Sequence, residues 1–384
     1  MPLPGVSAVP EAFLDTIVIN GGVYPQVSVP PKRVRFRMLN GSQARMYQVG
    51  SEGGFLPAVA IHDNTTPIPL DSTDSSGNTA LADGPFNLLL VPAERADVVI
   101  DFNGAAGSSF ILYSDAPGPF PGGDPRNDYF TGSPDQTAFG GAPTTTAGHG
   151  PNTRTLMKIV VTSGSGDTVD TTEWLKQLNV QLKSSFLNGN QPVLLFNNGD
   201  PSVPAFPFTE APDRVLTLNE DFDEFGRLIQ TVGTSTQNGF NNQGLPTWGR
   251  AYLDPVTENP RAGATEVWQV MNLTADTHPI HFHLVNVQLI QRQAFSGTPG
   301  RQGVDWSYSA DPTRPDPNEL GWKETVRMNP GEVTTVIMKF DLPVLPTAAM
   351  RNAVSPRTGG HEYVWHCHIL EHEEHDMMRP LVVL

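Results

Sequence analysis

The residues best suited to metal chemistry lie close together near the end of the chain. Residues 366–377 read His-Cys-His-Ile-Leu-Glu-His-Glu-Glu-His-Asp-Met and include the only cysteine among 384 residues. A second segment, residues 278–283, reads His-Pro-Ile-His-Phe-His. A thiolate, imidazoles and a thioether together form the ligand set of a blue-copper electron-transfer site. These residue types therefore indicate a copper site that two separate segments assemble.

The spacing of these residues predicts two metal environments rather than one. Residues 362–368 are rich in aromatic and β-branched side chains, which is typical of a β-strand. Side chains alternate between the two faces of a strand, so the cysteine and its two neighbouring histidines point in opposite directions. Histidines two residues apart in the upstream segment share a face. The two expected groups are Cys367 with His278, His372 and Met377, and His281 with His283, His366 and His368.

The combined pattern H-C-H-x-x-x-H-x-x-x-x-M and H-P-x-H-x-H resembles the signature of the third cupredoxin domain of multicopper oxidases. Residues 363–380 are most similar to bacterial spore-coat laccases and bilirubin oxidases. The resemblance implies a type 1 copper held by three residues with an axial methionine, and it implies type 2 and type 3 coppers on the other face. The implied ligands are His278, Cys367, His372 and axial Met377 for type 1, His281 for type 2, and His283, His366 and His368 for type 3.

The resemblance also implies an activity. Type 1 copper would oxidise small phenols or aromatic amines one electron at a time, and Cys367 would pass each electron through its backbone to His366 and His368. A trinuclear cluster would then reduce dioxygen to water. Glu373 would be a proton relay, with a solvated loop carboxylate as the alternative.

Two other classes of function remain open from the sequence. The chain could be a mononuclear blue-copper electron-transfer or copper-binding protein without oxidase activity, or a structural pair of β-sandwiches with vestigial ligands. Zinc sites match less well. His361-Glu362 begins an H-E-x-x-H motif but Trp365 stands in place of its second histidine, and structural zinc sites favour several cysteines.

Composition indicates an all-β protein. Glycine and proline number 36 each, and these residues break helices and punctuate turns. We expect two cupredoxin-like Greek-key domains, each a β-sandwich or barrel. The net charge of −16 disfavours nucleic acid and anionic membranes as partners, and no apolar run is long enough to span a membrane. The first residues lack the pattern of a signal peptide, although the family suggests an extracellular, periplasmic or spore-coat location.

An internal repeat supports two copies of one β-domain. Residues 91–102 align with residues 329–340, with Pro92 on Pro330 at an offset of 238 residues. Residues 36–40 align with residues 268–272, with Phe36 on Trp268 at an offset of 232. When the upstream histidines are shifted back by 232, they fall on Met46, Val49 and Ser51, none of which is a good copper ligand. We therefore expect a metal-free domain over 1–162, a linker over 163–212 and a copper-binding domain over 213–384.

The number of histidines does not suffice for a complete cluster. The family uses four H-x-H pairs, and this sequence contains two; the histidines outside the two groups are His62, His149, His361 and His375. The resemblance covers the middle and last domains of the family. We therefore expect one of three explanations: the chain is a fragment, a partner chain or a second copy of this chain covers the cluster face, or the protein is a simpler copper protein. Residues 296–321, between the histidine segments, are expected to form a long loop.

Overall fold

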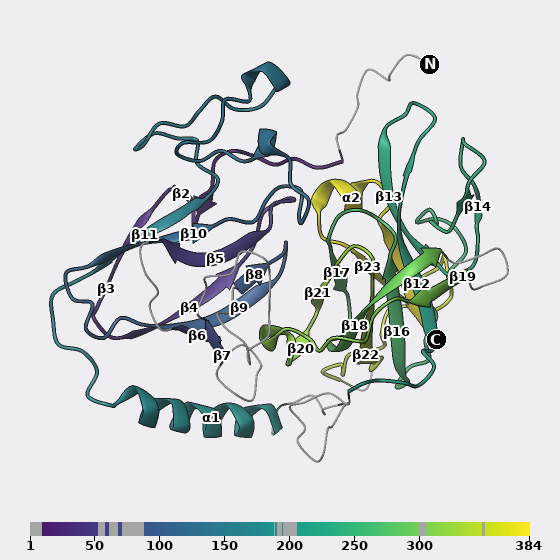
Figure 1. Ribbon diagram of the computed structural model, residues 1–384. Coiled ribbons are helices and arrows are strands. Elements are labelled where there is room, and N and C mark those ends of the chain that lie inside the picture. Colours follow the sequence, from purple (N-terminus) through teal and green to yellow (C-terminus); the bar gives the residue numbers. More distant parts are fainter. Residues whose placement is uncertain are drawn as a thin grey trace. The chain divides into compact units, whose positions relative to one another are not determined.

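The computed structural model describes residues 10–52, 58–60, 68–70, 88–187, 189, 194, 206–298, 305–347 and 350–384. The chain divides into two compact units. The N-terminal unit comprises Phe13–Pro192 and Asp316–Gly321, and the C-terminal unit comprises Met1–Ala12, Val193–Pro315 and Trp322–Leu384. Both units are built mainly from β-strands (Figure 1), which confirms the predicted all-β class. The domain boundaries predicted from the sequence remain a prediction.

The N-terminal unit contains two main sheets. The five-stranded sheet has the order β3 (Gln26–Val29), β11 (Thr155–Val161), β10 (Ser109–Ser114), β5 (Tyr47–Glu52) and β8 (Leu88–Leu90). The four-stranded sheet has the order β4 (Arg33–Leu39), β9 (Arg95–Asp101), β6 (Ala58–Ala60) and β7 (Ile68–Leu70). A small hairpin joins β1 (Val18–Ile19) and β2 (Gly22–Val23), and short 3-10 helices are η1 (Pro125–Asn127), η2 (Thr137–Phe139) and η3 (Pro317–Glu319).

Alternating side chains of β4 explain how this unit forms its core. Val34, Phe36 and Met38 pack against buried residues of β3, β8, β9 and β11. The intervening basic residues point away from that core, and Arg35 forms an ion pair with Asp97 of the neighbouring strand. This burial pattern is that of a half-buried strand in which apolar and basic residues alternate.

The C-terminal unit also contains two main sheets. The larger has the order β13 (Leu228–Thr234), β12 (Arg214–Phe222), β16 (Thr265–Asn272), β22 (Glu332–Lys339), β18 (Val287–Thr298) and β19 (Asp305–Tyr308), with β20 (Trp322–Lys323) also paired to β18. The smaller has the order β21 (Thr325–Met328), β17 (His278–Phe282), β23 (His361–Cys367) and β24 (Met378–Val383). Helix α2 (Leu370–Glu374) and a hairpin of β14 (Gly239–Phe240) and β15 (Pro246–Thr247) complete the unit.

An aromatic cluster joins the two sheets of the C-terminal unit. Trp268 of β16 lies 5.8 Å from Trp365 of β23 and 6.1 Å from Phe282 of β17, measured between ring centroids. The rings of Phe282 and Trp365 are stacked, and all three side chains are fully buried. Two of the three strands that carry this cluster, β17 and β23, also carry the histidine motifs.

The internal repeat has the same local structure in both units. Strand β4 pairs with β9 so that Phe36 faces Val98, and β16 pairs with β22 so that the aligned residues Trp268 and Val336 face each other. Two asparagines that follow these strands, Asn40 and Asn272, are buried and have matching hydrogen bonds. Each donates from its amide to two backbone carbonyls, those of Arg45 and Leu90 in one unit and of Asp276 and Met328 in the other. Equivalent hydrogen bonds at offsets of 231–238 residues support two copies of one domain.

Two predicted segments differ from their expected structure. The predicted linker contains helix α1 (Thr171–Leu187), which Asp170 caps by accepting a hydrogen bond from the backbone of Thr172. The predicted long loop over 296–321 contains the end of β18, strand β19 and η3. Tertiary pairing of β19 with β18 orders part of this segment despite its many glycines and prolines.

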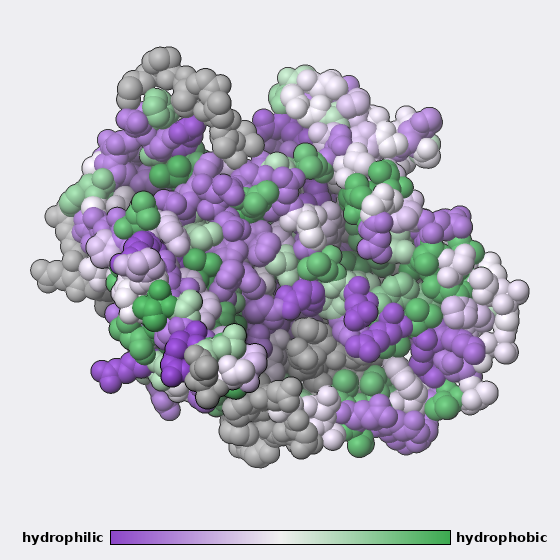
Figure 2. Space-filling view, turned by 180° about the vertical axis from the view of Figure 1, so that it is seen from behind, coloured by the Kyte–Doolittle hydropathy of each residue, from purple (hydrophilic) through white to green (hydrophobic). Residues whose placement is uncertain are grey.

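The described part of the chain contains no helix that is long and apolar enough to cross a membrane. On the face that Figure 2 shows, hydrophobic residues are interspersed with hydrophilic ones over most of the coloured surface. Exposed single apolar residues of this kind are normal for a folded domain and need no partner to explain them.

The two matching asparagines allow a test of how the copper-binding segment is supported. Asn272→Ala removes a buried amide that holds residues 272–276, just before His278, and leaves two carbonyls without their donor. We expect a loss of about 2–4 kcal/mol in unfolding free energy and weaker copper retention. The matched control Asn40→Ala should destabilise the N-terminal unit by a similar amount but leave copper retention unchanged. Urea unfolding and copper analysis after dialysis measure both; equal copper loss in the two variants would contradict the prediction.

Candidate metal centres

Three buried side chains from three elements of the C-terminal unit form the first candidate centre. Cys367 is the last residue of β23, His278 is the first of β17, and His372 lies in α2. The sulfur of Cys367 is 3.7 Å from Nδ1 of His278 and 3.6 Å from Nδ1 of His372. The two Nδ1 atoms are 3.2 Å apart, and all three residues are fully buried. Three donor atoms therefore converge on one point.

These distances fit one bound metal ion. With metal–sulfur bonds of about 2.3 Å and metal–nitrogen bonds of about 2.0 Å, two ligands on one ion lie roughly 3.3–3.7 Å apart. A trigonal set of two histidines and one cysteine is the ligand arrangement that blue-copper sites use, and its soft thiolate suits copper. The donor set of this centre therefore fits copper.

Met377 is fixed beside these three residues by its backbone. Its N–H donates to the carbonyl of His372, and its carbonyl accepts from the N–H of Cys367, both at 2.9 Å. Its side chain is fully buried. These two bonds bring the predicted axial residue next to two of the other three candidate ligands.

Burial sets the protonation of the donors in this centre. Burial, with the neighbouring His372, holds the pKa of His278 well below its usual value, so this imidazole is neutral and able to bind a metal. Burial raises the pKa of the Cys367 thiol well above its usual value. The thiol therefore keeps its proton until a cation stabilises the thiolate, and metal binding has to release that proton.

Two further residues orient the histidines of this centre. The hydroxyl of Thr274 lies 2.7 Å from Nε2 of His278, and a carboxylate oxygen of Glu11 lies 3.1 Å from Nε2 of His372. The Thr274 contact occupies the outer nitrogen of His278, so its Nδ1 is the nitrogen available to a metal, whereas Glu11 approaches His372 without a hydrogen bond. Sequence reasoning missed both residues. Glu11 in particular carries no local signal, because only the fold brings residue 11 to residue 372.

Acidic side chains surround the outer edge of His372. Burial, together with Glu11 and Glu220, raises the pKa of Asp276 to about 6. Burial likewise raises the pKa of Glu220, and Glu11 adds to that rise. These carboxylates are close enough to one another and to His372 to interact electrostatically, so the edge of this imidazole lies in a negative environment.

Four histidines form the second candidate centre. Nε2 of His283 lies 3.3 Å from Nε2 of His366, the separation that two nitrogen ligands of one ion have. Nδ1 of His281 contacts the carbonyl of Glu324 and the hydroxyl of Thr325, so Nε2 is the nitrogen suited to a metal. The ring of His368 lies 5.5 Å from that of His366 and 5.7 Å from that of His281. His283 is exposed, whereas His366 is buried.

Glu373 lies beside this second centre. Its carboxylate is 3.2 Å from Nδ1 of His366, and the same nitrogen is 3.0 Å from the carbonyl of Cys367. Burial raises the pKa of Glu373 and lowers that of His366. The contact orients His366 so that its Nε2 points at His283, and it places a carboxyl with a raised pKa next to the histidine group.

The structure brings six of the predicted ligands together in two groups, whereas His368 lies beside the second group and Met377 is placed beside the first by its backbone. Among the described residues, the candidate metal groups are His278 with Cys367 and His372, and His281 with His283 and His366. His149, His361 and His375 belong to neither group, and His62 lies outside the described residues. The role of each residue as a copper ligand remains a prediction.

Fold and site together define a cupredoxin-like copper protein. Residues 228–384 match the multicopper oxidase family model. The chain is 31% identical to a laccase of Bacillus subtilis over 99% of its own length and 56% of that protein. It is 29% identical to the multicopper oxidase LPR1 of Arabidopsis thaliana over 98% of its own length and 54% of that protein. Residues 228–384 therefore carry a multicopper oxidase domain, and the chain spans little more than half the length of these relatives.

Solved structures support the fold independently. A variant of the McoA multicopper oxidase from Aquifex aeolicus matches with a TM-score of 0.54 at 20% identity, covering 99% of this chain and 62% of that one. A laccase-like multicopper oxidase from Ochrobactrum matches with a TM-score of 0.52 at 19% identity, covering 95% and 59%. At these identities the likeness shows a shared cupredoxin-like fold.

The buried thiol leads to a prediction about proton release. Copper(II) binding at neutral pH should release about one proton from Cys367 and produce an intense blue colour, and binding should tighten as the pH rises. Calorimetry in two buffers of different ionisation enthalpy measures the released protons. Cys367→Ser should release none at this site and remain colourless. Blue colour without proton release would show that the thiol is already ionised before copper binds.

Proposed function

We propose that this chain is the type 1 and half-cluster portion of a laccase-like oxidase that oxidises small aromatic donors one electron at a time. The observation that carries the proposal is the convergence of a thiol and two imidazole nitrogens within 3.2–3.7 Å of one another, directly next to a four-histidine group. Bound copper would supply a one-electron redox centre at the first group and contribute to dioxygen reduction at the second.

The chain's own residues give each group a separate task. His278, Cys367 and His372 bind the type 1 ion in a site from which water is excluded, and Met377 provides a weak axial contact that adjusts its potential. His281, His283, His366 and His368 supply ligands to the type 2 and type 3 positions. Cys367 is covalently joined to His366 and His368, so a single backbone connects the two groups.

Glu373 has the position of a proton carrier in this proposal. Its carboxylate touches a histidine of the second group, and burial raises its pKa above the usual value. A carboxyl with a raised pKa beside a histidine can exchange a proton with a neighbouring acceptor. Dioxygen reduction consumes protons, and a carboxyl beside the second group could deliver them.

The second candidate function is electron transfer without oxidase activity. It is favoured by the exposure of His283 and by the number of histidines that this chain contributes, which is half of what the family uses. Residues 1–384 alone should therefore bind one copper tightly, because affinity depends on the number and geometry of ligands. A partner domain, a partner chain or a second copy of this chain would supply the remaining histidines.

Copper content and oxygen uptake separate these two functions. Purified residues 1–384 should retain about one copper per chain after dialysis and reduce dioxygen slowly, if a trinuclear cluster needs all its ligands. His283→Ala should leave both the blue colour and the retained copper unchanged, since it lies outside the type 1 group. A monomer with four coppers per chain and efficient four-electron reduction of dioxygen would contradict the proposal that this chain holds half a cluster.

The acidic environment of His372 favours positively charged donors. Glu11, Glu220 and Asp276 act on the edge of this imidazole, and the chain carries a net charge of −16. A negative potential raises the local concentration of cations and repels anions. Cationic aromatic amines should therefore reduce the type 1 site faster than anionic aromatic donors of the same potential.

This preference can be measured without oxygen turnover. Stopped-flow bleaching of the blue colour should be about tenfold or more faster for an aromatic amine with a quaternary ammonium group than for its sulfonated counterpart. Added salt should reduce the ratio, because screening weakens the attraction. Glu220→Gln should also reduce the ratio of the two rates. The control is Glu224→Gln, on the turn after β12, which should leave that ratio unchanged. Equal rates for both donors at low salt would contradict the role of the acidic group.

A further inference from the structure

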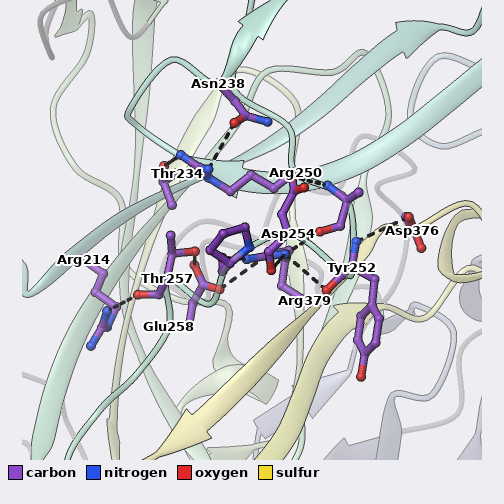
Figure 3. Close-up of polar contacts among 12 residues, drawn as sticks. Arg214, Thr234, Asn238, Arg250, Tyr252, Asp254, Thr257, Glu258, Asp376 and Arg379 are labelled. Atoms are coloured by element: carbon purple, nitrogen blue, oxygen red, sulfur yellow. Dashed lines mark hydrogen bonds and ion pairs between the residues drawn. The ribbon is translucent and has the colours of Figure 1, made fainter. Parts of the chain in front are cut away.

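A buried arginine lies two residues after the predicted axial ligand. Arg379 belongs to β24, where it pairs with Trp365 of β23, and none of its side chain is exposed. Its guanidinium donates hydrogen bonds to the backbone carbonyls of one loop (Figure 3). The four acceptors are the carbonyls of Ala251, Tyr252, Asp254 at 3.2 Å and Pro255 at 2.6 Å.

The two terminal nitrogens of Arg379 satisfy carbonyls of the loop, whereas its Nε has no hydrogen-bond partner. A buried charge is costly unless hydrogen bonds and an opposite charge compensate it, and buried carbonyls need donors. The carboxylate of Glu258, which is itself buried, lies 3.8 Å from Nε of Arg379. The backbone of Val382 also donates to the carbonyl of Glu258 at 2.9 Å. Residues 251–258, here called the clamp loop, are therefore fastened along β24.

The clamp loop also contacts the chain on the other side of Met377. The N–H of Tyr252 donates to the carboxylate of Asp376 at 3.4 Å (Figure 3). Asp376 has a φ of +72°, in the left-handed region that favours glycine. A non-glycine residue keeps this conformation only where its surroundings hold it. The loop thus holds the residue before Met377 and the residue two positions after it.

We infer that Arg379 is a positioning residue for the axial ligand Met377 and that it acts through the clamp loop. The inference rests on the proposed type 1 site. A long thioether–copper contact is too weak to hold the methionine by itself, and the axial ligand adjusts the redox potential of such sites. The fixed backbone on both sides of Met377 sets how closely its sulfur approaches the metal.

The decisive experiment is a double-mutant cycle on the type 1 potential of the copper-loaded chain. Arg379→Lys keeps the positive charge but cannot donate hydrogen bonds to four carbonyls. A shift in the redox potential of this variant therefore does not arise from a lost charge. The variant should keep the blue colour, raise the potential in the same direction as Met377→Leu, and speed copper loss to a chelator several-fold. In the double variant the potential should equal that of Met377→Leu alone, because Arg379 acts only through the methionine.

A matched control separates positioning from general stability. Arg214 donates to the carbonyl of Thr257 in the same loop and pairs with Glu266, but it lies on β12, away from the copper-binding strands. Arg214→Lys should lower the unfolding free energy without moving the potential. If Arg379→Lys does not fold, Asp376→Gly is the alternative variant. It removes the contact between Asp376 and Tyr252, and glycine tolerates the positive φ at this position. Its shift in redox potential should likewise not add to that of Met377→Leu.

The outcomes distinguish this inference from the function on which it rests. An unchanged potential in a folded Arg379→Lys or Asp376→Gly variant, or shifts that add to that of Met377→Leu, overturns the positioning role while the type 1 site stands. A copper-loaded wild-type chain that stays colourless overturns the type 1 site, and the positioning role with it.

Discussion

Strand β23 is the element on which both candidate centres depend. Its pairing with β17 places Cys367 opposite Ile280 and His366 opposite His281, and its pairing with β24 fixes the other edge. Because side chains alternate along a strand, a slip of one residue would exchange the faces of Cys367 and its neighbours. The fully buried Trp365, packed between Trp268 and Phe282, resists that slip. The aromatic core therefore maintains the register that keeps the two groups apart yet adjacent.

The sequence predicted most of what is local and periodic. Alternation along residues 362–368 separated Cys367 from His366 and His368, and the structure has this separation. The contact between Glu11 and His372 joins residues at opposite ends of the chain, and no spacing rule reports such a pair. The clamp of Arg379 on residues 251–258 was missed for the same reason. The helix α1 was missed because its apolar residues give little amphipathic pattern within a polar segment.

The repeat shows what a cupredoxin-like domain needs apart from metal ligands. Asn40 and Asn272 each follow a strand and hold the turn after it by hydrogen bonds. The aligned residues Ala93 and Gly331 also share a positive φ, of 65° and 69°. In the C-terminal unit this turn ends at His278, whereas the aligned position in the N-terminal unit is Met46, a buried apolar residue. The same backbone framework thus supports a candidate metal ligand in one copy and a buried apolar residue in the other.

The candidate type 1 centre places metal affinity and fold stability in opposition. Two imidazole nitrogens held 3.2 Å apart beside a buried thiol would be destabilising as isolated polar groups, since little water is available to solvate them. The fold tolerates the arrangement because neighbours contact each group. Thr274 contacts the outer nitrogen of His278, the Glu11 carboxylate lies beside that of His372, and the backbone of Met377 bonds to both Cys367 and His372. Contacts of this kind restrict the motion of the donor side chains, and restricted side chains lose less conformational entropy on binding. A loosely held set of the same residues would bind copper less tightly. The ion would then determine the coordination geometry of the site, and with it the redox potential.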